Sequence, residues 1–140
     1  MPIEIQANVS SVPVDKVWEY YTNPEHIVYW NFASNDWECT RAKSDLCPGG
    51  RFIYHMAAKD RSMGFDFEGT FTVIEANKHL AYKLDDDRSV QVLFCPQNNS
   101  KTTVKITFDP DSAHDDEFQR QGWQSILNNF KKYAEARICD

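Results

Sequence analysis

The C-terminal part of the sequence carries the clearest periodic pattern of apolar residues. Between Asp115 and Arg137 these residues recur at spacings of three to five, which is the period of a helix with one buried face. Acidic residues stand where the first turn would be, and basic residues lie toward the end, as the helix dipole favours. We predict one long helix with a buried stripe made of Phe118, Trp123, Ile126, Leu127, Phe130, Tyr133 and Ala134.

The N-terminal segment changes from strand-like to helical patterning. Apolar and polar residues alternate over 3–9, which predicts a half-buried strand. A short helix from Val14 to Tyr21 follows, with Ser11 or Asp15 as its cap. Pro24 suits a first helical turn, so we predict a second short helical piece over Pro24–Trp30.

The middle of the chain returns to the period of two that is typical of strands. We expect Pro96 to end one of these strands, and Gly69 to mark a bend or a close approach of two backbones. Phe65, Phe67, Phe71 and Val73 are expected to share the inner face of the longest strand. The predicted strands are Trp37–Lys43, Arg51–Ala57, Phe65–Val73, Leu80–Leu84, Val90–Phe94 and Thr102–Phe108.

This order of elements predicts an α+β fold. Short turns between the strands imply an antiparallel meander, with about seven strands in all. A single long helix covers such a sheet only if the sheet bends around it. The 140 residues contain no repeat, low-complexity segment or linker, so we expect one domain over residues 1–140.

Charge and cysteine content narrow the classes of partner. The net charge of −6 makes nucleic acids and anionic membrane surfaces poor partners, and no apolar run reaches the length needed to cross a membrane. The N-terminus lacks the pattern of a secretory signal. Four scattered cysteines, Cys39, Cys47, Cys95 and Cys139, form no C-x-x-C pair. We therefore expect a cytoplasmic protein with reduced thiols.

Five short motifs resemble one known family. They are Val17-Trp18-Glu19 followed by Thr22–His26 and Trp30, Pro48–Phe52, Phe67–Thr70, Ile74-Glu75-Ala76 with Leu80, and Gly122-Trp123 with Leu127. In this order, and over Val12–Ala136, the chain resembles the family named for the activator of the heat-shock protein 90 ATPase. Members of this family often carry a histidine shortly before the glycine of the last motif, and this chain has none there.

The resemblance implies the helix-grip fold of the START (SRPBCC) and birch-pollen-allergen-like superfamily. In that fold a curved antiparallel sheet wraps around a long C-terminal helix, and two short helices after the first strand plug the open side. An internal cavity often lies between sheet and helix. Members of the superfamily bind lipids, hormones or polyketides, and some act as cyclases.

Twelve residues are our candidates for contact with a ligand in such a cavity. Trp30, Phe32 and Trp37 lie between the short helices and the sheet, where they either rim the cavity mouth or pack as a lid. Gly122 either leaves room for a ligand or permits close packing of the helix. The other candidates share the predicted inner faces, where they line a cavity or form ordinary core: Tyr54, Met56, Phe67, Tyr82, Val92, Phe94, Trp123 and Ile126.

Signals for catalysis are sparse. The four histidines have no metal-ligand spacing, and no nucleophile elbow or catalytic cysteine signature occurs, so we expect no metal and no cofactor. Tyr54, Tyr82 and His26 are the candidates for proton transfer. We favour a domain that binds a small apolar or amphipathic molecule. The alternatives are a chaperone-associated interaction module and an enzyme of the cyclase or hydratase type, and the sequence leaves the oligomeric state open.

Overall fold

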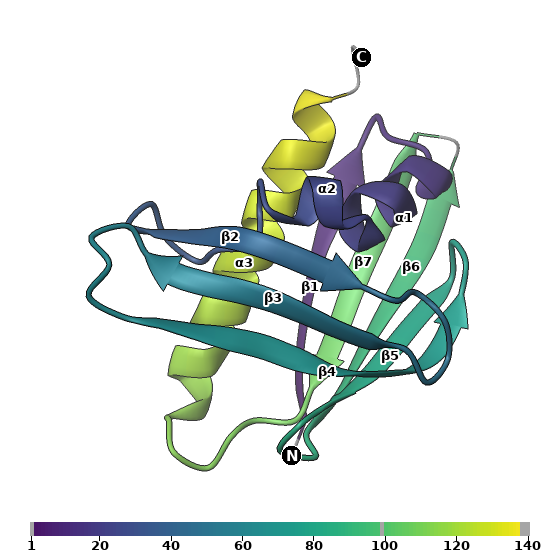
Figure 1. The fold of residues 1–140 in the computed structure, drawn as a ribbon. Coiled ribbons are helices and arrows are strands. Elements are labelled where there is room, and N and C mark those ends of the chain that lie inside the picture. Colours follow the sequence, from purple (N-terminus) through teal and green to yellow (C-terminus); the bar gives the residue numbers. More distant parts are fainter. Residues whose placement is uncertain (1, 99, 138–140) are drawn as a thin grey trace.

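A computed structural model describes residues 2–98 and 100–137 of the chain. Within these residues seven strands form one antiparallel sheet, and three helices pack on it (Figure 1). The helices are α1 (Val14–Thr22), α2 (Pro24–Ile27) and α3 (Asp116–Ala136). The strands are β1 (Ile3–Ser10), β2 (Trp37–Ser44), β3 (Arg51–Ala58), β4 (Gly64–Glu75), β5 (His79–Leu84), β6 (Ser89–Asn98) and β7 (Lys101–Phe108).

The strands follow the order β1-β7-β6-β5-β4-β3-β2 across the sheet. From β2 to β7 every strand pairs with the next one along the chain, so the predicted meander is confirmed. The helices α1 and α2 lie in the connection between the two edge strands. Figure 1 shows how the sheet bends, so that β2 to β4 cross α3 while β1, β7 and β6 form the other wall. The predicted α+β helix-grip architecture is therefore confirmed.

The long helix α3 begins one residue later than predicted and buries one face. Asp115 is its N-cap, and the carboxylate accepts hydrogen bonds from the backbone N–H groups of Glu117 and Phe118. Leu127, Phe130 and Ala134 are completely buried beneath the sheet and the short helices. The predicted burial of Phe118 is wrong, because this side chain is 66% exposed and stacks on the ring of His114.

The polar side chains of α3 also have a structural role, because they cover the open edge of β1. Three of them donate hydrogen bonds to backbone carbonyl groups of β1. Without these bonds the carbonyl groups would be open to pairing with another strand. These bonds are Arg120 to Glu4 (2.8 Å), Gln124 to Gln6 (3.2 Å) and Lys131 to Asn8 (2.7 Å).

A β-bulge in β4 corrects the predicted inner face of that strand. Phe71 pairs with Tyr82, but Val73 pairs with Ala81, so the register shifts at Thr72. Val73 is thereby turned away from the core, and Ile74 packs against it instead. The period of two could not reveal this shift, because one inserted residue reverses the faces of all residues that follow.

Three element ends also differ from the prediction. β6 continues through Pro96, which pairs with Thr102 before the register shifts again. The N-cap of α1 is Pro13, and neither Ser11 nor Asp15 caps it, since the N-cap makes no side-chain hydrogen bond. The second helical piece ends earlier than predicted, at Ile27, and continues as a turn to Trp30.

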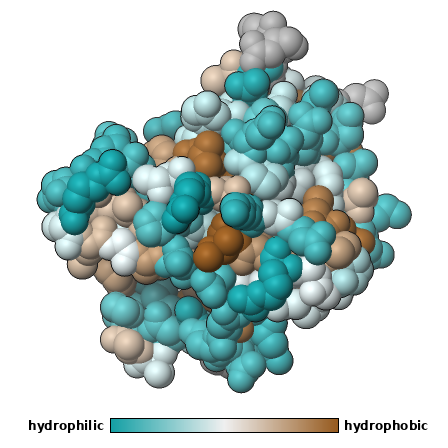
Figure 2. Space-filling model, viewed as in Figure 1, coloured by the Kyte–Doolittle hydropathy of each residue, from teal (hydrophilic) through white to brown (hydrophobic). Residues whose placement is uncertain are grey.

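Gly69 lies where two strands and an aromatic ring come close together, as the sequence predicted. A Cβ atom at this position would lie 2.5 Å from the carbonyl oxygen of Lys83 and 3.1 Å from the ring of Phe52. The opposite, outer side of β2 to β4 is mostly hydrophilic, with scattered hydrophobic side chains (Figure 2). The cysteines within the described ranges, Cys39, Cys47 and Cys95, are free thiols, and Cys139 lies outside those ranges.

Candidate ligand cavity

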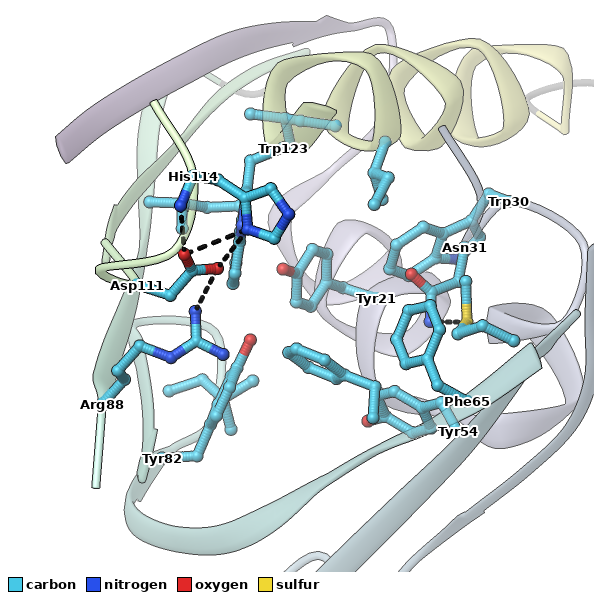
Figure 3. A pocket seen from close by; sticks show the side chains of 16 residues that line it. Tyr21, Trp30, Asn31, Tyr54, Phe65, Tyr82, Arg88, Asp111, His114 and Trp123 are labelled. Carbon is cyan, nitrogen blue, oxygen red and sulfur yellow. Dashed lines mark hydrogen bonds and ion pairs between the residues drawn. The ribbon is translucent and has the colours of Figure 1, made fainter. Parts of the chain in front are cut away.

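A cavity of about 410 Å³ lies between the concave face of the sheet and α3 (Figure 3). Its walls come from α1, from the segment after α2, from strands β3, β4, β5 and β7, and from α3. The loop that joins β7 to α3 and the turn before β6 complete one end. Segments that are far apart in the sequence therefore meet around one space, and most of the side chains that line it are aromatic or aliphatic.

Seven of the twelve candidate residues line this cavity. Phe67 packs edge-on against Trp123 of α3 at 6.0 Å between ring centroids, and against Tyr82 at 6.3 Å. The indole N–H of Trp30 donates to the carbonyl of Tyr20, so its ring presents only apolar surface to the cavity. The seven residues are Trp30, Tyr54, Met56, Phe67, Tyr82, Trp123 and Ile126.

The other five candidates lie elsewhere. Val92 and Phe94 are buried in the core, where the ring of Phe94 packs under Trp18 of α1. Trp37 packs beside Phe65 at the start of the sheet, and the carbonyl of Phe32 accepts a hydrogen bond from Asn129. Gly122 does not line the cavity, and a Cβ atom there would meet nothing within 4 Å. Close packing of the helix is therefore not the reason for this glycine.

Three tyrosine side chains bring hydroxyl groups to the cavity: Tyr21, Tyr54 and Tyr82. Burial raises the pKa of each phenol above its ordinary value of 10.0. A charged Tyr21 would also repel a charged Tyr54 or Tyr82, which raises the pKa of both further. The hydroxyls are thus neutral hydrogen-bond donors near neutral pH.

One end of the cavity is polar and comes from residues that the sequence did not single out. Asp111 accepts a hydrogen bond from the ring of His114 (3.1 Å) and forms an ion pair with Arg88 (3.8 Å). Burial alone would raise the pKa of Asp111, but the hydrogen bonds from His114 and from the backbone of Ala113 outweigh it and lower that pKa. Figure 3 shows this group at the end of the cavity near Tyr82.

Gln119 holds the loop that carries this polar group. It is only 7% exposed, although it occupies a polar position in the helix sequence. Its amide donates to the carbonyls of Asp111 (3.1 Å) and His114 (3.0 Å), and its oxygen accepts from the backbone N–H of Asp111 (2.8 Å). These three bonds place Asp111 and His114 relative to α3.

Two further polar side chains bear on the predicted chemistry. Asn31 lines the cavity, is 9% exposed, and donates a weak hydrogen bond to the sulfur of Met56 at 3.6 Å. His26 does not line the cavity, and its Nδ1 hydrogen-bonds the hydroxyl of Tyr133 at 2.6 Å. Burial, followed by the charge of Arg137, lowers the pKa of His26. His26 is therefore not placed to exchange a proton with a molecule in the cavity.

The remaining lining residues were not among the candidates. Leu80 and Ile106 continue the period of two in their strands, and Leu127 belongs to the predicted helix stripe, so a signal for them existed. The polar residues Arg88, Asp111 and His114 lie in turns and loops, where no periodic pattern indicates which way a side chain points. The residues that sequence reasoning missed are Tyr21, Asn31, Phe65, Leu80, Arg88, Ile106, Asp111, His114 and Leu127.

Within residues 2–98 and 100–137, no three His, Cys, Asp or Glu side chains cluster in a way that would hold a metal ion. In the same ranges no helix has the length and apolar character needed to span a membrane.

Comparison with known proteins shows which family has this sequence and architecture. The family model described as "Activator of Hsp90 ATPase homolog 1-like protein" matches residues 11–135. The chain belongs to this family. The resemblance noted from its motifs is thereby confirmed, together with the helix-grip superfamily. No curated protein matches the chain.

Solved structures of similar proteins agree with the family. The solution structure of the AHSA1-like protein from Aeromonas hydrophila is 46% identical, with a TM-score of 0.89 over 97% of this chain and 93% of that one. A protein from Cytophaga hutchinsonii is 38% identical, with a TM-score of 0.82 over the same shares. A crystal structure from Nitrosomonas europaea, 18% identical, shares the fold with a TM-score of 0.81 over 100% of this chain and 97% of that one.

Proposed function

We propose that this protein binds a small apolar or amphipathic molecule in the cavity between the sheet and α3. The observation that carries the proposal is the cavity itself, because a volume of about 410 Å³ remains open inside a core rich in large aromatic side chains. Pockets that hold small molecules have volumes of about 300–1,000 Å³ and mainly apolar linings. The volume suits a compact ligand of one to three rings.

The affinity of such a ligand comes mostly from apolar surface removed from water, at about 25 cal/mol for each Å². Aromatic side chains such as Phe67 and Trp123 contact it from the strand and the helix. The lining has few polar groups, and these orient the ligand. No catalytic step is part of this proposal.

The binding function is tested with phenylnaphthylamine, an uncharged fluorophore whose emission rises in apolar surroundings. We expect saturable emission with the unmodified protein. Ile126→Trp replaces an aliphatic side chain with a large indole ring that fills part of the cavity, and it should weaken binding at least about tenfold. Ile53→Trp makes the same exchange on the outer face of β3 and should leave the affinity unchanged.

Three results would refute the binding function: no saturable emission with the unmodified protein, equal affinity of both variants, or a melting temperature unaffected by saturating probe. Native mass spectrometry of the freshly purified protein gives an independent readout, because a retained ligand adds a discrete mass.

A second candidate function is interaction with a chaperone, which the description of the family suggests. Two large apolar side chains are exposed at this end of the sheet, Met63 in the β3–β4 turn and Phe65 at the start of β4, and they offer a contact surface for such a partner. This function predicts that a chaperone of the Hsp90 type is retained on the immobilised protein and that Met63→Ser, which leaves the cavity lining unchanged, releases it. It also predicts that small lipophilic molecules do not change the melting temperature.

A further inference from the structure

The hydroxyl groups of the three cavity tyrosines have no hydrogen-bond partner among the described residues. None of the three oxygens is a fully buried polar atom, so each keeps surface that is accessible from the cavity. A hydroxyl that faces such a cavity takes its partner from the molecule that fills it. Tyr82 is only 8% exposed, and Figure 3 shows its hydroxyl and that of Tyr21 pointing into the cavity. Tyr54 lines the same space. A ligand that accepts hydrogen bonds would satisfy these groups.

Formal charges in the lining are already neutralised. Among the described residues that line the cavity, these charges lie on Arg88 and Asp111, with His114 beside them. The guanidinium of Arg88 donates to Asp86 at 2.7 Å and pairs with Asp111. Asp111 also accepts bonds from the His114 ring and from two backbone N–H groups. Neither an anionic nor a cationic ligand finds a free counter-charge here.

We propose that the cavity selects an uncharged molecule that carries a hydrogen-bond acceptor of the carbonyl type, bound by the hydroxyls of Tyr21 and Tyr82. A carbonyl oxygen has two lone pairs and so accepts bonds from two converging O–H donors. This inference rests on the proposed binding function and names the ligand class for the same cavity.

Three probes of nearly equal shape distinguish the ligand classes: a naphthyl methyl ketone, isopropenylnaphthalene and naphthoate. They present an uncharged acceptor, a hydrocarbon and an anion to the same site. Each is measured by displacement of phenylnaphthylamine at neutral pH. We expect the ketone to bind about tenfold more tightly than the hydrocarbon, because two neutral hydrogen bonds are gained. Naphthoate should bind more weakly than both, because its charge loses water without gaining a partner.

Removal of the hydroxyls should abolish this preference. In the double variant Tyr21→Phe with Tyr82→Phe, the ketone should bind only as tightly as the hydrocarbon, whose own affinity should stay unchanged. Tyr29→Phe removes a phenol that is 66% exposed and does not line the cavity, so the preference should persist. The comparison of the three probes on the unmodified protein does not depend on the folding of any variant.

The outcomes separate this inference from the binding function. If the hydrocarbon binds as tightly as the ketone, or if naphthoate binds most tightly, the ligand class is wrong while binding in the cavity stands. If the double variant keeps the preference for the ketone, the tyrosines are not its source. If the fluorophore binds at a saturable site but none of the three probes displaces it, the ligand class is wrong. If the fluorophore itself shows no saturable binding, the binding function is wrong, and the ligand class with it.

Discussion

Gly122 and Gly69 should respond in opposite directions to the same substitution. Gly122 lies in the interior of α3, and a Cβ atom there would meet nothing within 4 Å. Alanine is more favourable than glycine in a helix interior by about 1 kcal/mol. The main reason is that an unfolded chain with alanine has less conformational freedom to lose when it folds. No steric cost offsets that gain, so Gly122→Ala should raise the free energy of unfolding by about 0.5–1 kcal/mol.

At Gly69 the neighbours reverse the sign. The added Cβ would lie 2.5 Å from the Lys83 carbonyl oxygen and 3.1 Å from two atoms of the Phe52 ring. The nearest atom belongs to the backbone of the paired strand β5, so relief of the clash requires the strands to separate. Forcing extra atoms into a packed region costs about 1–3 kcal/mol. Gly69→Ala should therefore lower the free energy of unfolding by about that amount.

Urea unfolding followed by circular dichroism measures both effects. We expect the midpoint for Gly122→Ala to rise by about 0.4 M with an unchanged slope, and its melting temperature to rise by about 3 °C. Loss of stability in Gly122→Ala would refute the reasoning, because it would mean that a neighbour occupies the open space. Unchanged affinity of this variant for phenylnaphthylamine is also expected, since Gly122 does not line the cavity.

Three further predictions concern the core, the helix start and the cavity tyrosines. Phe130→Ala removes a fully buried ring that packs against Tyr21 and Trp30, and should cost about 3–5 kcal/mol in chemical denaturation; a cost below about 1 kcal/mol would contradict that packing. Asp115→Ala removes the N-cap and should cost about 1 kcal/mol, whereas Asp115→Asn should retain most of the stability. The raised pKa values of Tyr21, Tyr54 and Tyr82 mean that the folded state holds their protons more tightly than the unfolded state. Their contribution is complete below pH 10, the ordinary phenol pKa, and is lost as the pH rises further, so stability should fall steeply above pH 10. Ultraviolet titration should show these phenols ionising only with unfolding, and early ionisation of all six tyrosines would disprove it.

Much of the fold follows from local periodicity. The stripe in α3 and the alternation in the strands were strong enough to predict the element order, the meander and the α+β class. The errors lie where one residue changes the phase of a pattern. Because of the bulge at Thr72, Ile74 packs against the core in place of Val73. In the first turn of α3, Phe118 is exposed, and Gln119 is buried and holds a loop.

Away from the bulge at Thr72 and the first turn of α3, the sequence by itself determined which residues point to the inside of each element, because side-chain direction in a regular strand or helix follows its period. It also contained the motifs that show the family. Only the tertiary structure decided which inward residues fill the core and which line a cavity. Val92 and Tyr82 both point inward, yet Val92 is completely buried in the core and Tyr82 lines the cavity. The difference depends on how far the bent sheet stands from α3 at each point. The polar group of Arg88, Asp111 and His114 forms because β6 begins beside the end of β7, where Val90 pairs with Phe108, so that the turn before β6 adjoins the loop after β7.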